Sequence, residues 1–585
     1  MTETSETLKK PKIAMQPAIL AVLLLILFLG TALRLWGLGD KSLRGDEIAL
    51  ALRIRKGLIS ILLNQYNSLT YVVNYFFSFL ANGSREFILR FSSFLEGVLG
   101  IAAIYRIGKL WHGEKEGLIS AFLLGISYTH IFYSQDARFY ALMVLLSLLS
   151  LLSIWRALET NRAAYWLCFV LFSLLNLYNQ SLSLFVLGCE ACFAGGVILY
   201  KFAAATSVAS SHQEREPPPP TYRVPLGEAQ SQAKRLLLSL VVIACLYLPR
   251  LGLTASLLES TREFRMAGSS VEEEFRFVPV ILDVFRQLLA VRNLALALFA
   301  ILFLCGLLSN LTHQRRIGIA LLTLLWITVP FLIYLILSWK TLGFTSRYLI
   351  FLLPVLYITV ARGVCVIADT LGWISRERLG WPDLWVRGAV TGLSLVLFAI
   401  ISSRSLRYYY PREKQNWRDT AAFLQKAVAA SEAVVASSAY RLDCLLYYGM
   451  SQERLFVSEG LPAFRELAAQ YQGVWFVGAV SPREPYDREI DRWLREQEAF
   501  QLTFQGVWSD IRVAYEAKGD LTPGQQVALL QSAVALTPRD HLLRLDLGDA
   551  YRAAGRKVEA IAEYRYALQL DPENARARSR LKELP

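Results

Sequence analysis

The stretch that decides the fold is residues 19–47, ILAVLLLILFLGTALRLWGLGDKSLRGDE. Its first part, Ile19 to Leu38, is an apolar run of the length that crosses a bilayer. Lysines precede this run, which is too long for the core of a signal peptide, so we predict an uncleaved first span whose basic end is cytoplasmic. The residues that follow are then external, and they present two adjacent carboxylates, Asp46 and Glu47.

The composition supports a membrane protein. The chain has 585 residues, of which 54% are hydrophobic and 19% are charged, and its mean hydropathy is +0.37. Soluble domains are nearer 45–50% apolar and about 25% charged, so a soluble enzyme, a disordered chain and a small disulfide scaffold are excluded. The net charge is +13. Because Lys and Arg gather at the ends of the apolar runs and no nucleic-acid-binding motif accompanies them, we predict no nucleic-acid partner.

The apolar runs predict about 11 membrane spans within residues 1–403. After the first run, the others are 87–110, 117–133, 139–157, 164–178, 182–202, 236–253, 288–308, 317–339, 348–368 and 388–402. This threading places the basic loops on the cytoplasmic side. The run 69–80 is too short to span, so we predict an interfacial or re-entrant helix there. The Pro-rich, polar segment 203–234 is predicted to be a flexible cytoplasmic loop.

The tail follows a different pattern and is predicted to be external. Helix-like segments at 416–430 and 487–500 alternate with buried-strand patterns at 434–438 and 474–480, which predicts a small α/β domain over 404–518. The fold class is therefore a mostly α polytopic membrane protein that carries this domain and further C-terminal helices.

Residues 519–585 contain a repeat. The pair Ala533 and Pro538 recurs as Ala567 and Pro572, an offset of 34 residues that is the tetratricopeptide period. The intervening matches are Leu547-Gly548, Tyr551, Ala560 and Tyr564. Because three repeats are usually needed for independent stability, we expect this unit to pack on the α/β domain. Its usual role predicts a protein partner.

Three polar clusters fall on the external side. The first is Asp46-Glu47, which can be solvated loop charges or can place a general base beside a lipid-linked substrate. The second is residues 133–140, YSQDARFY, in which Asp136 and Arg138 can form a local ion pair or bind an anion such as phosphate.

The third cluster runs from Lys340 to Ser346-Arg347-Tyr348. Its cations can anchor a helix at the lipid head groups or neutralise a phosphate leaving group. Because all three polar clusters are predicted on the external side of the membrane, we expect them to line one cleft. Other external cations, such as Arg44 and Arg250, could contribute to it.

These motifs, together with Arg90-Phe91-Ser92-Ser93, resemble the GT-C glycosyltransferases. The closest group is the bacterial family that resembles protein O-mannosyltransferases and the lipid A aminoarabinose transferase. The resemblance covers about residues 15–400 and is strongest over 30–160. The sequence departs from the family pattern at 67–71, NSLTY, where members often have a His/Pro-rich stretch.

The resemblance implies an inverting transfer of a sugar from a polyprenyl-phosphate carrier to an acceptor on the external face of the bacterial inner membrane. The N-terminus would be cytoplasmic and the C-terminus periplasmic. Asp46 matches the catalytic aspartate, with Glu47 as a reserve base. By position alone, Arg138, Arg347 and Lys340 are candidates to bind the donor phosphate, and Asp136 and Tyr71 are candidates to position the acceptor or a metal. A divalent metal stays open, since some members use one.

Two other functions remain as alternatives. A transporter or lipid flippase would favour charges at mid-membrane and duplicated, broken helices, whereas the candidate charges lie at one face. A non-catalytic scaffold that displays the tetratricopeptide unit would leave Asp46 dispensable.

Overall fold

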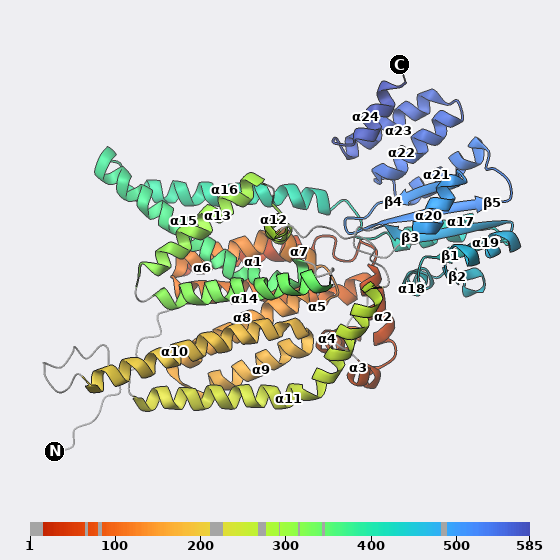
Figure 1. Cartoon of the computed structure of the whole chain (residues 1–585). Coiled ribbons are helices and arrows are strands. Elements are labelled where there is room, and N and C mark those ends of the chain that lie inside the picture. Colours follow the sequence, from red (N-terminus) through yellow and green to blue (C-terminus); the bar gives the residue numbers. More distant parts are fainter. Residues whose placement is uncertain are drawn as a thin grey trace.

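The computed structural model describes residues 16–64, 68–79, 85–210, 226–266, 277–291, 293–313, 316–341, 346–480 and 488–584. A helical bundle forms the body of the molecule, and a mixed sheet and the C-terminal helices lie at one end of it (Figure 1). The predicted fold class is confirmed.

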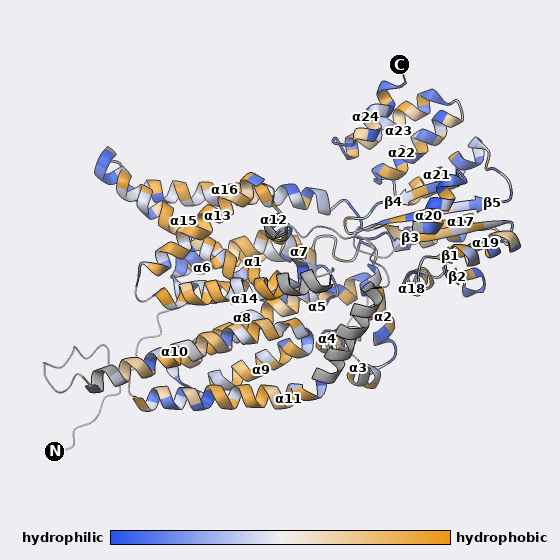
Figure 2. Ribbon diagram, viewed as in Figure 1, coloured by the Kyte–Doolittle hydropathy of each residue, from blue (hydrophilic) through white to orange (hydrophobic). Residues whose placement is uncertain are grey.

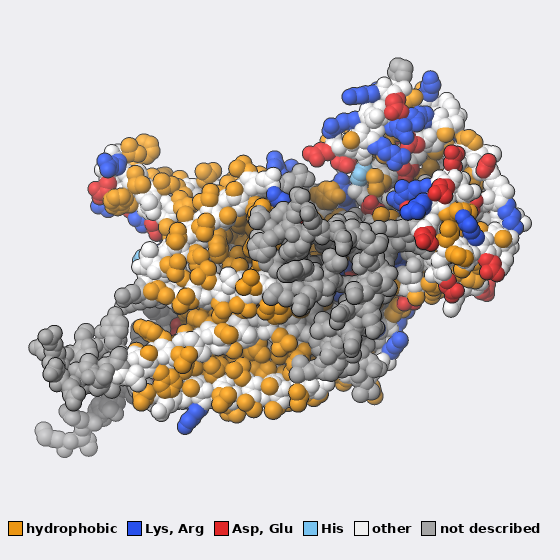
Figure 3. All heavy atoms as spheres, viewed as in Figure 1, with side chains coloured by type: hydrophobic (Ala, Val, Ile, Leu, Met, Phe, Trp, Pro, Cys, Tyr) orange, Lys and Arg blue, Asp and Glu red, His pale blue; other side chains and the backbone are white. Residues whose placement is uncertain are grey.

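The bundle has the length and polarity of a membrane domain. In the described part of the chain, eight helices are long and apolar enough to span a bilayer. They coincide or overlap with α1 (Pro17–Leu35), α5 (Arg85–Trp111), α8 (Tyr140–Thr160), α10 (Leu184–Ser210), α11 (Leu226–Met266), α13 (Asn293–Leu311), α15 (Leu353–Ile374) and α16 (Asp383–Tyr409). Apolar residues dominate these helices (Figure 2), and on the face seen in Figure 3 hydrophobic side chains cover the bundle.

The other three predicted spans correspond to less regular helices. One is a bent pair, α6 (Glu114–Ile126) and α7 (Tyr128–Ser134), whose axes differ by 60°, and which would make a ninth span. The other two fall on α9 (Ala163–Asn179) and α14 (Ile317–Thr341), which qualify only as shorter apolar helices over their described residues. Each predicted run therefore lies on a helix, but fewer than 11 of them pass as spans.

Short helices gather at the end of the bundle that faces the sheet. They are α2 (Gly45–Ile54), α3 (Leu58–Asn64), α4 (Ser68–Phe77) and α12 (Phe277–Leu289). The predicted short helix at 69–80 corresponds to α4, which packs against α2, α5 and α9.

The predicted loop 203–234 is wrong at both ends. Helix α10 continues to Ser210 and α11 begins at Leu226, while 211–225 lies outside the described residues. Alanine and glutamine are good helix formers, and a contact holds the two extensions together. Lys201 Nζ donates to Gln232 Oε1 at 3.0 Å and lies 3.6 Å from Glu228 Oε1.

The sheet has the strand order β2-β1-β3-β5-β4. Its strands are β1 (Glu432–Ala436), β2 (Leu455–Val457), β3 (Gly473–Val480), β4 (Phe500–Phe504) and β5 (Asp510–Ala517). β1 is parallel to β2 and β3, and β5 is antiparallel to β3 and β4. The helices of this domain are α17 (Trp417–Ala427), α18 (Ala439–Tyr447), α19 (Leu461–Gln470) and α20 (Arg488–Glu496). β3 nearly coincides with the predicted strand 474–480, and β1 overlaps the predicted strand 434–438 but begins and ends two residues earlier.

The domain continues from the last membrane helix. α16 extends through the predicted boundary at 403 to Tyr409, so the linker to the sheet starts directly at the bundle. Helices α21 (Pro523–Leu536), α22 (His541–Ala553), α23 (Lys557–Leu570) and α24 (Ala575–Lys582) complete the chain. α22 packs on β4. A Cβ at Gly548 would lie 2.5 Å from the Tyr564 ring, so small and aromatic residues meet there; the tetratricopeptide assignment itself stays a prediction.

Candidate active site

The two carboxylates after the first span occupy the first turn of α2. Successive residues of a helix point about 100° apart, so adjacent side chains meet different surroundings. The Asp46 side chain is 31% exposed, whereas the Glu47 side chain is fully buried. Asp46 can therefore contact a substrate, whereas Glu47 can contact only protein groups.

Glu47 is held by four hydrogen bonds. Its Oε1 accepts from Arg90 Nε at 2.7 Å and from Ala137 N at 3.0 Å. Its Oε2 accepts from Arg90 Nη2 at 2.8 Å and from Arg44 N at 2.9 Å. Burial by itself would raise the pKa of Glu47, but Arg90 keeps that pKa well below its ordinary value. Glu47 therefore ties α2 to α5 and to the loop before α8, and its acceptor positions are already occupied.

Asp46 lies among cations and remains accessible. Its Oδ2 lies 3.0 Å from Arg44 Nη2, and its Oδ1 lies 3.3 Å from Arg138 Nη1. The Tyr440 hydroxyl donates to Oδ1 at 3.1 Å. Burial would raise the pKa of Asp46, but Arg138, Arg44 and Arg347, with the Tyr440 hydrogen bond, lower that pKa well below its ordinary value. Asp46 is therefore an exposed anion at neutral pH.

Arg44 joins the first cluster to the second. Its Nη1 lies 3.3 Å from Asp136 Oδ2, and both side chains are buried. Lys414, in the linker after α16, places Nζ 3.6 Å from Asp136 Oδ1 and also donates to the Gln135 carbonyl. Burial lowers the pKa of Lys414 to about 8, although Asp136 opposes this effect. Asp136 is thus a structural anion between two cations.

Arg138 completes this network. Burial disfavours its charge, but Asp46, followed by Tyr140 and Tyr71, keeps the pKa of Arg138 well above its ordinary value. The Tyr71 hydroxyl accepts a hydrogen bond from Arg53 Nη1 at 3.3 Å.

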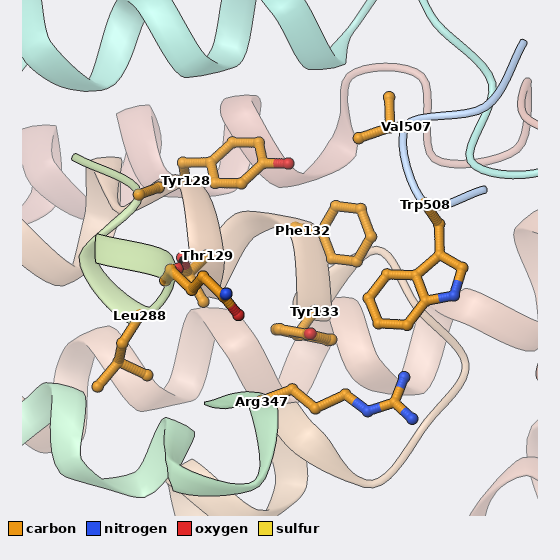
Figure 4. Close-up of a pocket in the computed structure, with 10 residues that line it drawn as sticks. Tyr128, Thr129, Phe132, Tyr133, Leu288, Arg347, Val507 and Trp508 are labelled. Atoms are coloured by element: carbon orange, nitrogen blue, oxygen red, sulfur yellow. Dashed lines mark hydrogen bonds between the residues drawn. The ribbon is translucent and has the colours of Figure 1, made fainter. Parts of the chain in front are cut away.

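The third cluster contributes Arg347 to a cavity of about 310 Å³. The wall of this cavity is largely aromatic (Figure 4). Its aromatic residues are Tyr128, Phe132, Tyr133 and Trp508. The Arg347 guanidinium lies 4.8 Å from the Trp508 ring, and the Arg44 guanidinium lies 4.3 Å from the same ring. All three sequence clusters therefore meet in one region, except that the side chain of Lys340 lies outside the described residues.

The site also contains residues that sequence reasoning missed. Lys414, Tyr440 and Trp508 come from the linker and the domain that carries the sheet, and Arg44 was one unranked cation among several. Lys414 is one of several basic residues that follow the last span, so its position did not single it out. Nothing in the local sequence marks Tyr440 or Trp508, because their importance lies in contacts with residues hundreds of positions away.

The carboxylates do not fit a metal centre well. Asp46 and Asp136 each pair with Arg44, whose positive charge competes with a divalent ion. Among the residues that the structure describes, no group of three or more His, Cys, Asp or Glu side chains could hold a metal ion.

Comparisons with known proteins agree with this architecture. The model of the family Dolichyl-phosphate-mannose-protein mannosyltransferase matches residues 69–189. The oligosaccharyltransferase of Archaeoglobus fulgidus superposes with a TM-score of 0.50 at 12% identity, over 78% of this chain and 69% of that one. The chain has the fold of the GT-C glycosyltransferases.

Another solved GT-C structure, ArnT from Cupriavidus metallidurans, matches with a TM-score of 0.47 at 12% identity, over 85% of this chain and 97% of that one. No curated protein matches the sequence. The segment that matches the family model includes Arg90, Asp136 and Arg138, three residues of the network described above.

Proposed function

We propose that the protein is a membrane glycosyltransferase that moves a sugar from a polyprenyl-phosphate carrier to an acceptor hydroxyl with inversion at the anomeric carbon. The observation that carries the proposal is Asp46, a partly exposed carboxylate held between Arg44 and Arg138 beside the Arg347 cavity. A base and phosphate-binding cations in one cleft are what such a transfer needs.

The cations favour a phosphate-linked donor. The Nε–H groups of Arg138 and Arg347 are buried and, within the described part of the chain, have no acceptor for a hydrogen bond. A phosphate would supply the missing acceptor oxygens. The name of the matched family, which includes a dolichyl-phosphate-mannose donor, supports a lipid-linked phosphate. Lys340 is a further candidate for this contact.

The reaction is a single displacement. The acceptor hydroxyl gives its proton to the Asp46 carboxylate while its oxygen forms a bond to the anomeric carbon. The bond from that carbon to the phosphate oxygen breaks, and polyprenyl phosphate departs as an anion that Arg138 and Arg347 stabilise. No proton is needed on the leaving group, and attack from the opposite side gives inversion.

Donor binding also improves the base. The same arginines that lower the pKa of Asp46 would share their charge with a bound phosphate. An anion near Asp46 would raise the pKa of its carboxyl toward the working pH. Asp46 then accepts a proton most readily when the donor is in place.

The remaining roles concern the acceptor and the membrane. Asp136 and Tyr71 would shape the acceptor side of the site, and the C-terminal helices would bind an acceptor or a protein partner. The protein would reside in a bacterial inner membrane with a cytoplasmic N-terminus and a periplasmic C-terminus. No step of this reaction requires a metal ion.

The test is transfer of radiolabelled sugars from a panel of polyprenyl-phosphate donors by membranes that contain wild-type protein or Asp46→Asn. Loss of a positioned base should lower transfer by about 10²–10⁴-fold. The matched control is Asp369→Asn, at a half-exposed aspartate that pairs with Arg387 on α15 and α16, and it should transfer normally. Equal transfer by a well-folded Asp46→Asn protein would overturn the role of Asp46 as the base, whereas no transfer above background by the wild type would favour the scaffold function.

A further inference from the structure

Trp508 brings the external domain into the membrane cavity. It lies in the loop between β4 and β5, and its ring contacts the guanidinium groups of two arginines. The ring centroid is 4.3 Å from Arg44 Cζ and 4.8 Å from Arg347 Cζ. Figure 4 shows the Trp508 and Arg347 side chains approaching each other at the cavity wall.

The backbone fixes the position of this ring. Val507 N donates to the Glu413 carbonyl at 2.8 Å, and Trp508 N donates to the Lys414 carbonyl at 3.0 Å. Residues 413 and 414 lie in the linker, four and five residues after the end of α16, so these bonds attach the loop to the linker next to the bundle. Gly506 permits this approach, because a Cβ there would lie 2.6 Å from the Lys414 carbonyl oxygen and 2.2 Å from that of Ser509.

The loop is held from the other side by the C-terminal helices. Gln505 N donates to Asp540 Oδ2 at 2.6 Å, and Asp540 is the N-terminal cap of α22. The Gly506 N–H donates to Asp510 Oδ1 at 3.0 Å. The loop is therefore connected on both sides, and the orientation of the indole is set before any ligand binds.

Two guanidinium groups near one site repel each other, and an aromatic face attracts both. Arg44 is also paired with Asp46 and Asp136, whereas Arg347 faces the cavity. We propose that Trp508 is a positioning residue that aligns Arg44 and Arg347 for the phosphate of the lipid-linked donor. This inference rests on the proposed function, since it assigns the cavity to the phosphate of that donor.

The size of the effect follows from the contact. A cation over an indole contributes about 2-fold at an exposed site to about 30-fold when it is desolvated. Trp508 is half-buried, so we expect phosphate binding to weaken within that range when the aromatic face is lost. A smaller aromatic ring should retain most of the binding.

The test measures binding of undecaprenyl phosphate to the purified full-length protein in detergent. We expect the Kd to rise by about 2- to 30-fold for Trp508→Leu and by less than about 3-fold for Trp508→Phe. Undecaprenol and inorganic phosphate, each alone, separate the lipid chain from the phosphate. Trp385→Leu is the matched control, since Trp385 is 79% exposed near the other end of α16.

A double-mutant cycle separates positioning from a structural role. If Trp508 acts through Arg347, Trp508→Leu should add little to the loss caused by Arg347→Gln. If the wild type binds undecaprenyl phosphate and both Trp508→Leu and Trp508→Phe bind it with the same Kd, this inference is overturned but the proposed function is not. Additive losses would also overturn it, because they would mean that Trp508 acts independently of Arg347. Failure of the wild type to bind undecaprenyl phosphate would overturn the proposed donor class and this inference with it.

Discussion

The two ends of the membrane bundle carry charges in opposite ways, although the same helices supply both. At the site end of α5, Arg90 is buried and pairs with buried Glu47, whereas at the other end Lys109 and Glu114 are 31% and 33% exposed. At the start of α8, Arg138 joins Asp46 and is 18% exposed. At the end of that helix, Arg156 pairs with Glu159, its own neighbour one turn away. One end holds a buried network of charges around Asp46, whereas the pairs at the other end are mostly exposed, apart from Arg362 with Glu116, whose side chains are 13% and 8% exposed.

The domain that carries the sheet produces this difference. It covers one end of the bundle and supplies Lys414, Tyr440 and Trp508 to the network, so that charges there are removed from water. Buried charges must be compensated by partners, while exposed pairs contribute little. The concentration of buried charge around one partly exposed aspartate is the physical sign of a functional end.

The largest effect on stability should come from breaking the buried ion pair between Glu47 and Arg90. Glu47→Gln leaves the buried Arg90 without a balancing charge, and loss of one partner of a buried pair costs about 3–5 kcal/mol. Unfolding of the purified protein in mixed detergents measures this free energy. Glu114→Gln, at the exposed end of the bundle, should cost less than about 1 kcal/mol. Similar losses for the two variants would contradict the contrast between the ends.

A smaller effect should appear in the pH dependence of stability. Burial, assisted by Lys414, lowers the pKa of Lys41 from 10.5 to about 7. Between those pH values the unfolded chain binds more protons than the folded one, so stability rises with pH, by at most about 1.4 kcal/mol per pH unit for one proton.

The variant Lys41→Met should flatten this rise when unfolding is measured between pH 7 and pH 9.5. Lys109→Met, which removes the exposed lysine at the other end of α5, should preserve the slope. An unchanged slope in Lys41→Met would show that the buried lysine is not responsible.

The smallest effect should come from the surface pair on α8. Arg156 Nη1 lies 2.9 Å from Glu159 Oε2, with both side chains more than one third exposed. Arg156→Gln should change the free energy of unfolding by less than about 0.5 kcal/mol, and sugar transfer should not change. A loss above about 1 kcal/mol would mean that this end of the bundle also holds an essential network.

The spans and the short helix α4 could be predicted because a bilayer demands about 20 apolar residues and alternating sides for basic loops. β1 and β3 were predictable as buried apolar runs. β2, with three residues, was too short to stand out. β4 and β5 carry polar residues such as Gln501 and Arg512 that interrupt an apolar pattern. The segment 203–234 misled because polar composition does not prevent a helix that has a partner helix beside it.

The candidate site was partly predictable for a related reason. Asp46, Arg138 and Arg347 stood out as charges at the edges of apolar runs, where charge is scarce. Their proximity depends on the packing of three separate segments, which are α2, the loop before α8 and the residues before α15. That same packing gives Glu47 and Asp46 different surroundings, which no pattern of adjacent residues distinguishes.

The lengths of the apolar runs and the positions of the basic residues were sufficient to predict a polytopic membrane protein. They also predicted that its candidate charges lie on one side. They are sufficient because the bilayer acts on every segment independently of the others. Only the tertiary structure decided that Glu47 is buried and Asp46 partly exposed. It also decided that Trp508 contacts Arg44 and Arg347. Those contacts join residues up to several hundred positions apart, and burial among specific partners, not residue type, sets their charge and their chemistry.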